Sequence, residues 1–160
     1  MTRVVLVPGA LALLPAYASQ VDPLPELRAA ALAAVRWLGE VPGGVEVLAD
    51  PQGERVADAL LEAAAVRRGS GAYLVVGNGS AKRSEKAPGH LDERSSAFDD
   101  ALRSALVAGD LGGVDWSLAG DLWAAVDGIR RAADVIAGPA RVDLDDDPYG
   151  VQYWVMRWGA

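Results

Sequence analysis

The chain contains no cysteine, a single histidine and a single phenylalanine among its 160 residues. The absence of cysteine excludes disulfides, thiolate metal ligands and a cysteine nucleophile. Any chemistry must therefore come from His90, carboxylates, hydroxyls, amines or backbone amides. An excess of basic residues is also lacking, since the formal net charge is -7. Duplex nucleic acid is consequently disfavoured as a partner.

The sequence has no apolar run that is long and unbroken enough to cross a membrane. Its beginning imitates a secretory signal, with one arginine, an apolar run and Ala16-Tyr17-Ala18 before Ser19. Pro8-Gly9 interrupts this run, so we predict a buried strand from Arg3 to Val7 and a loop from Pro8 to Pro15. We expect a soluble, cytoplasmic protein.

What the chain does contain is a balance of 51% hydrophobic and 23% charged residues. This composition suits one globular domain over residues 1–160. Apolar spacing alternates between strand and helix periods along the sequence. Strands are predicted at 3–7, 45–48, 72–76, 141–144 and 151–158, and helices at 24–38, at 56–64 with an end near 67–69, from a cap at Ser95-Ser96 to Leu106, and at 118–133.

The strand pattern from Ala72 to Val76 is apolar on both faces, which is typical of a central strand covered on both sides. We expect it to share a parallel sheet with Val4 to Val7 and Val45 to Leu48. The two last strands follow each other closely, so they should add to this sheet in antiparallel fashion. The sequence therefore predicts an α/β fold, a three-layer α/β/α sandwich with a partly parallel sheet.

The segment 77–94 is dense in turn residues and polar groups, and it lies between a buried strand and a helix. Sites in α/β proteins gather at such places. Gly77-Asn78-Gly79-Ser80 could aim backbone amides at an anion, with Lys82, Arg83 and Lys86 adding positive charge. We predict that the amides near Gly79 and Ser80 face a cleft. A structural turn that holds a long loop is the alternative.

Other candidate sites in the sequence are weaker. The Gly-Lys-Ser/Thr ending of a P-loop and a G-x-G-x-x-G fingerprint are both missing, which disfavours a nucleotide site. His90 with Asp92 and Glu93 could form a general base with an orienting carboxylate, or simply a polar surface. We expect Asp92 or Glu93 to pair with Arg83 or Arg94. The acidic run Asp145-Asp146-Asp147 lacks the ligand spacing of a calcium loop and is typical of a solvated turn.

Three parts of the chain together carry a family pattern. They are Pro8 to Ala18, the residues Gly77-Asn78-Gly79-Ser80-Ala81 continuing through Ala87-Pro88-Gly89, Asp92-Glu93-Arg94 and Phe98-Asp99, and the C-terminal Asp147-Pro148-Tyr149-Gly150-Val151. These stretches resemble the catalytic-subunit-like proteins of the class III extradiol ring-cleavage dioxygenases, and especially a small actinobacterial branch of that family. The chain is shorter than such relatives, with the missing length expected between the second and third strands.

Active members of that family open catechol-type rings with a non-haem Fe(II) held by two histidines and a glutamate. The resemblance places the ligand histidines at Pro8-Gly9-Ala10 and at Ala49-Asp50-Pro51, and the acid–base histidine at Ala81. None of these positions holds a histidine, and the ligand glutamate has no assigned position. We therefore expect no cofactor. Fe(II) belongs only to an alternative, in which unrecognised carboxylates or a second subunit supply the metal site.

The leading hypothesis is a dioxygenase-like pseudoenzyme that binds a small anionic molecule or a protein partner through the old active-site cleft or a neighbouring face. One alternative is an extradiol-type oxidoreductase with an atypical metal site, and another is a structural subunit of a complex. Nucleic acid and membrane partners are not expected, and homo-oligomers stay open. The residues predicted to line the cleft are Asn78, Ser80, Lys82, Arg83, His90, Asp92 and Arg94; in the plainer alternative, Asp92, Glu93 and Arg94 only pin the loop through ion pairs.

Overall fold

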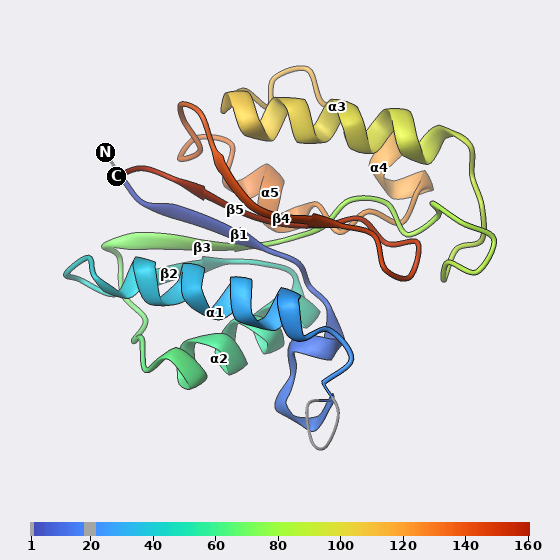
Figure 1. Ribbon diagram of the computed structural model, residues 1–160. Helices are drawn as coiled ribbons and strands as arrows, with labels where there is room; N and C mark the ends of the chain where they lie inside the picture. Colours follow the sequence, from blue (N-terminus) through green and yellow to red (C-terminus); the bar gives the residue numbers. More distant parts are fainter. Residues whose placement is uncertain (1, 18–21) are drawn as a thin grey trace.

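A computed structural model describes residues 2–17 and 22–160 of the protein. It has a five-stranded mixed sheet with helices on both faces, as the sequence predicts (Figure 1). Ala18 and Ser19, which complete the imitation of a secretory signal, lie outside the described residues. The strands are β1 (Val4–Val7), β2 (Val45–Leu48), β3 (Ala72–Val76), β4 (Arg141–Asp146) and β5 (Tyr153–Trp158).

The strand order in the sheet is β2-β3-β1-β5-β4. The first three strands are parallel, while β5 runs antiparallel to β1 and β4 runs antiparallel to β5. The predicted interior place of Ala72–Val76 is confirmed, because β3 lies between β2 and β1. The middle strand of the five is β1, whose four residues are all fully buried.

Two helices cover one face of the sheet, α1 (Pro25–Gly39) and α2 (Pro51–Ala64) (Figure 1). Apolar residues at helical spacing in α1, from Leu27 to Leu38, face the side chains of Val5 and Leu74. Periodicity predicts both helices. The expected end of the second helix near Arg67 is wrong, because the backbone turns into the left-handed conformation at Ala65, with φ 55°.

The opposite face is covered by α3 (Arg94–Ala108), α4 (Trp116–Asp121) and α5 (Asp127–Arg131). Trp154 and Trp158 of β5 are buried here, and the Trp158 Nε1–H donates to the carbonyl of Leu106 at 3.1 Å. Two short 3-10 helices, Leu11–Leu13 and Pro15–Tyr17, follow β1. None of the helices within the described residues has the length and apolar character that crossing a bilayer requires.

The single helix predicted over residues 118–133 is wrong, since α4 and α5 are separate. The chain breaks between them at Trp123, which has a left-handed φ of 56°. The loop after β3 uses the backbone of this break: the Asn78 amide donates to the Ala125 carbonyl at 3.0 Å, and the Ala81 amide donates to the Leu122 carbonyl at 3.0 Å. These long-range bonds compete with the helical bonds that a continuous helix would make.

The predicted Ser95-Ser96 cap of the third helix is also wrong. The helix begins one residue earlier, at Arg94, and its N-cap position is Glu93, whose side chain makes no capping bond. Ser95 is buried in the first turn, and its hydroxyl donates to the carbonyl of Lys82 at 2.9 Å. Its polar side chain thus serves the loop rather than the helix terminus.

Candidate functional site

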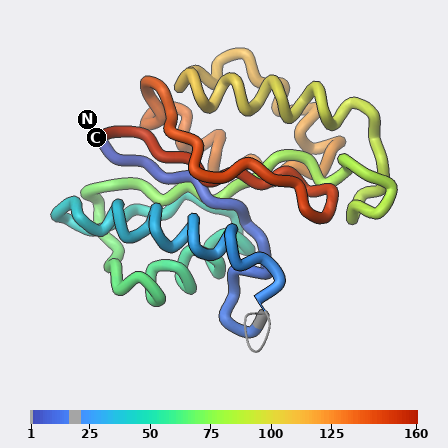
Figure 2. Tube along the Cα trace, viewed as in Figure 1, coloured from blue at the N-terminus to red at the C-terminus, as the bar shows by residue number. Residues whose placement is uncertain are grey.

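After the carboxyl ends of the neighbouring strands β1 and β3, the chain crosses to opposite faces of the sheet. After β1 the chain leads to α1 on one face of the sheet, whereas after β3 it leads to α3 on the other face (Figure 2). Parallel sheets open a crevice at such a reversal, and ligands of α/β proteins bind there. We therefore expect a binding site at this end of the sheet.

The floor of the crevice joins the two strands through backbone and amide groups. Gly9 follows β1, and its amide donates to the Oδ1 atom of Asn78 at 3.3 Å. Asn78 follows β3, is only 7% exposed, and donates its own Nδ2 to the Gly79 carbonyl at 3.1 Å. Gln52 donates to the Gly9 carbonyl at 2.7 Å. The floor is thus ordered by its own bonds.

A cleft of about 410 Å³ opens over this floor. Of the four large hydrophobic side chains that are exposed among the described residues, three line it. Trp123 is 57% exposed and Tyr149 is 54% exposed, so much of the cleft wall is bare aromatic surface. The lining residues are Gly9, Ala10, Leu11, Ala12, Leu24, Gln52, Asn78, Pro88, Trp123, Ala125, Tyr149, Val151 and Tyr153.

Trp123 combines large exposure with an unfavourable backbone. A bulky residue in the left-handed region costs about 1 to 2 kcal/mol, and such residues cluster at functional sites. The Lys82 ammonium stacks on this ring, with its Nζ atom 5.1 Å from the ring centroid. Lys82 therefore places a positive charge at the rim of the cleft, close to an aromatic face that is open to solvent.

The phenol of Tyr153 lies half-buried in the cleft wall. Burial raises the pKa of Tyr153 above its ordinary value, and the nearby Tyr149 phenol raises this pKa further. The group therefore stays neutral at physiological pH and keeps its O–H as a hydrogen-bond donor. The cleft thus offers aromatic faces, amide and phenol groups, and a cation at its rim.

The predicted anion site at Ser80 is filled by the protein's own carboxylate. Asp99 of α3 is 2% exposed; its Oδ1 accepts from the Ser80 amide at 2.8 Å and its Oδ2 accepts from the Ser80 hydroxyl at 2.6 Å. The Gly79 amide donates to the Gln152 carbonyl at 2.9 Å. The prediction that these amides face a cleft is therefore wrong, because an internal carboxylate and a backbone carbonyl take them.

Arg83 belongs to the same internal cluster. Its guanidinium donates to Asp99 at 3.0 Å and to Asp147 at 2.8 Å, so it ties the loop after β3 to α3 and to the turn before β5. Desolvation acts first on the pKa of Arg83, in the lowering direction, but the two carboxylates outweigh it and raise the pKa. Arg83 is therefore not the partner of Asp92 or Glu93.

His90 and Asp92 lie at the outer end of the loop, and Arg94 is the first residue of α3. His90 is exposed, with φ 59°, and its Nδ1 lies 3.3 Å from the Glu85 carbonyl. It is thus a surface residue, as in the plainer of the two interpretations of the sequence, and not part of a dyad with Asp92. The prediction that Asp92 or Glu93 pairs with Arg83 or Arg94 is confirmed by Asp92 and Arg94, whose Oδ2 and Nη2 atoms are 2.8 Å apart. This guanidinium, together with the Arg94 amide, holds the pKa of Asp92 at about 2.

Of the seven residues predicted to line one cleft, the structure places only Asn78 in its lining, and Lys82 stacks on the lining residue Trp123. Ser80 is buried and Arg83 is partly buried against Asp99, His90 and Asp92 lie elsewhere on the loop, and Arg94 begins α3. Sequence reasoning missed the aromatic wall. It assigned Tyr149 to a turn and Trp123 to a continuous helix, and the apolar neighbours Leu122 and Ala124 gave no local signal that Trp123 is exposed.

The positions that the resemblance assigns to iron ligands do not fit a non-haem iron site. Gly9 and Ala10 offer no side-chain ligand, and the buried Ala81 offers none. Asp50 caps α2, its Oδ1 accepting from the Gly53 amide at 2.6 Å. Within residues 2–17 and 22–160, no three His, Asp or Glu side chains converge on a point where a metal could sit.

No protein-family model matches the chain. A search of curated proteins also finds no match.

Proposed function

We propose that the protein is a non-catalytic, dioxygenase-like binding protein that holds a small planar anion of aromatic type in the cleft at the carboxyl ends of β1 and β3. The observation that carries this proposal is the pair of exposed aromatic side chains, Trp123 and Tyr149, on one cleft with Lys82 at its rim. Exposed aromatic surface in a concave site is suited to stacking against a flat ring.

Size and charge support the same ligand class. A cleft of about 410 Å³ is within the range in which proteins bind small molecules, roughly 300 to 1,000 Å³. The chain as a whole carries a net charge of -7, so a local cation is needed to attract an anion. Lys82 can supply it, whereas Arg83 is committed to Asp99 and Asp147.

The binding test uses four probes of similar size: benzoate, cyclohexanecarboxylate, benzamide and 3,4-dihydroxybenzoate. Calorimetry and tryptophan fluorescence would measure their affinities. We expect benzoate to bind more tightly than cyclohexanecarboxylate, since the ring stacks, and more tightly than benzamide, since Lys82 attracts charge. Equal affinities for the first three probes, or no binding of any probe, would overturn the proposal.

The ring-cleaving alternative is tested on the same protein. Metal analysis after purification without chelators, followed by anaerobic titration with Fe(II), would show whether iron binds in stoichiometric amount. We expect no tight iron and no oxygen-dependent consumption of 3,4-dihydroxybenzoate. Tight iron together with ring cleavage would replace the binding proposal with an extradiol-type enzyme whose ligands the resemblance does not identify.

A further inference from the structure

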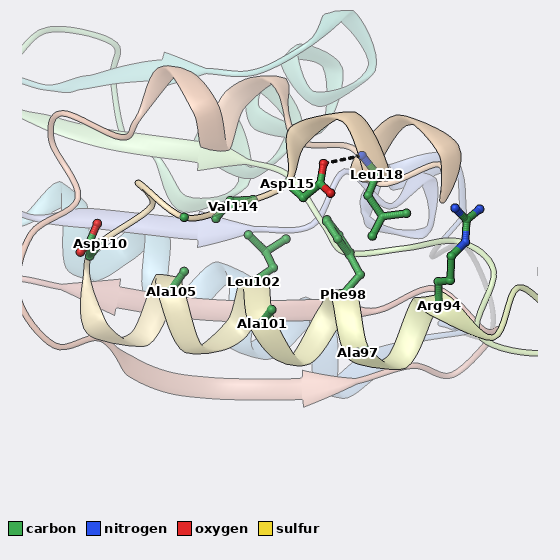
Figure 3. A pocket seen from close by; sticks show the side chains of 11 residues that line it. Arg94, Ala97, Phe98, Ala101, Leu102, Ala105, Asp110, Val114, Asp115 and Leu118 are labelled. Carbon is green, nitrogen blue, oxygen red and sulfur yellow. Dashed lines mark hydrogen bonds between the residues drawn. The ribbon is translucent and has the colours of Figure 1, made fainter.

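A second hollow lies along α3, outside the cleft. It is a groove of about 620 Å³ between α3 and residues 113–118 (Figure 3). Ala97, Ala101 and Ala105 of α3 form one wall, and Val114 and Leu118 lie opposite, as Figure 3 shows. We call this hollow the α3 groove. Because it is mainly apolar and open, it is suited to burial against another surface.

The alanines of the α3 groove suit close packing by a helix. They recur every four residues, so they lie on one side of α3, and Ala97 and Ala101 are exposed. Small side chains let a second helix axis approach to about 8 Å, the lower end of the range for packed helices. Beneath them Phe98 and Leu102 are buried, so the groove has a firm floor.

Opposite charges stand at the two ends of the α3 groove, as Figure 3 shows for Arg94 and Asp110. The Arg94 side chain is 55% exposed even though Asp92 pairs with it at 2.8 Å and Asp121 lies 3.8 Å away. The Oδ1 atom of Asp110 accepts from the Gly112 amide, which leaves its second oxygen for another partner. The sequence midpoint between these two charges is Leu102, which adjoins Ala101 in the middle of the helix.

This arrangement is complementary to itself. If a second α3 lies antiparallel in the groove, with a two-fold axis near Ala101, then Arg94 of each copy faces Asp110 of the other. A two-fold interface requires that kind of self-complementarity, in which one patch meets the same patch on its partner. A parallel arrangement would instead bring like charges together, which is unfavourable.

We infer that the α3 groove is the interface of a homodimer, with the two α3 helices antiparallel across a two-fold axis. The occupant of each groove is the α3 helix of the second copy. Apolar contacts between the alanines, Val114 and Leu118 would supply the buried core, and the Arg94–Asp110 pairs would set the orientation. This inference concerns a different face from the cleft and does not depend on the proposed ligand.

The first test introduces a charge at the centre of the groove. Light scattering on a sizing column and sedimentation over a wide concentration series would give the mass of the wild type and of Ala101→Glu. We expect the wild type to be a dimer and Ala101→Glu to be a monomer, because two carboxylates would meet at the axis. Ser96→Glu is the matched control, since Ser96 is also exposed on α3 but does not line the groove.

The second test reverses the terminal charges. Arg94→Glu or Asp110→Arg alone should weaken dimerisation by more than about tenfold, since each places like charges opposite one another twice. The double variant should restore the dimer. Melting curves from circular dichroism would verify that each variant folds. A wild type that stays monomeric at every concentration, or a dimer that neither Ala101→Glu nor the single reversals weaken, would overturn the inference.

Discussion

Two parts of the loop after β3 are both rich in polar residues, but one is buried in the protein and the other faces an open cleft. Ser80 and Arg83 surround the buried carboxylate of Asp99, and this Asp99 cluster is closed to solvent at its centre. Asn78, only two residues before Ser80, lines the floor of an open cleft whose wall includes the exposed Trp123. The polar residues of one short segment thus divide between holding the fold and offering a surface.

The difference comes from what the rest of the chain brings to each part. The helix α3 delivers an anion to the amide and hydroxyl of Ser80, so that potential anion site is already satisfied. The break between α4 and α5 delivers the aromatic ring of Trp123 to the cleft that Asn78 floors, with Lys82 stacked on it. The proposed site is therefore distinguished by exposed apolar surface rather than by the density of polar residues.

The largest expected effect comes from removing the centre of the Asp99 cluster. Asp99→Ala leaves the Ser80 amide and hydroxyl and the Arg83 guanidinium without their buried partner, so the free energy of unfolding should fall by about 3 kcal/mol or more. Urea unfolding measures this. Asp100→Ala is the control, since it changes the next residue of the same helix, which is exposed. An equal loss of stability in both variants would contradict the stabilising role of the Asp99 cluster.

The two cations Lys82 and Arg83 should behave in opposite ways. Arg83→Met should lower the free energy of unfolding by about 2 kcal/mol, because Asp99 loses a charged hydrogen-bond donor, and should leave benzoate affinity unchanged. Lys82→Met should leave stability nearly unchanged but weaken benzoate binding several-fold, and it should leave benzamide unaffected. Urea unfolding and calorimetry on both variants would check the pair. A loss of benzoate affinity in Arg83→Met instead would move the ligand to the Asp99 cluster.

Substitutions of Trp123 should separate the effect of its backbone conformation on stability from the effect of its ring on ligand binding. Trp123→Gly and Trp123→Ala should both weaken benzoate binding by about tenfold, a loss of about 1.4 kcal/mol, because stacking is lost. Glycine adopts the left-handed backbone without strain, so Trp123→Gly should be about 1 kcal/mol more stable than Trp123→Ala. Calorimetry measures the benzoate affinity, and urea unfolding measures the difference in stability. Full benzoate affinity in either variant would show that the ligand does not use this ring.

The smallest effect concerns the outer end of the loop. The pKa of Asp92 is about 2 in the folded protein against an ordinary value of 3.8. Its ionised form therefore adds stability that is present above pH 3.8 and is lost as the pH falls through 2. Asp92→Asn should show a shallower loss of stability between these pH values than the wild type. Urea unfolding at several acidic pH values measures this slope, with Glu93→Gln as the neighbouring control.

The sequence by itself determined the sheet and the helix layer of α1 and α2. Runs such as Ala72–Val76 and the helical spacing from Leu27 to Leu38 bury apolar groups through local periodicity, which a neighbouring window of sequence reveals. It also included the pair of Asp92 and Arg94 among the pairings it left open, because residues two positions apart are close in space. The sequence also identified the end of the sheet at which the cleft lies, because the polar segment that begins at Asn78 directly follows the apolar strand β3.

Only the tertiary structure decided which polar groups are hydrogen-bonded within the protein and where the cleft opens. Asp99 lies in a different element from Ser80, and Trp123 meets Lys82 across a long stretch of chain. The backbone bonds from Asn78 and Ala81 to residues 122–125 break a segment whose spacing predicts one helix. Contacts between distant residues outweigh local preference when they satisfy buried polar groups, because leaving such groups unpaired costs more than an irregular turn.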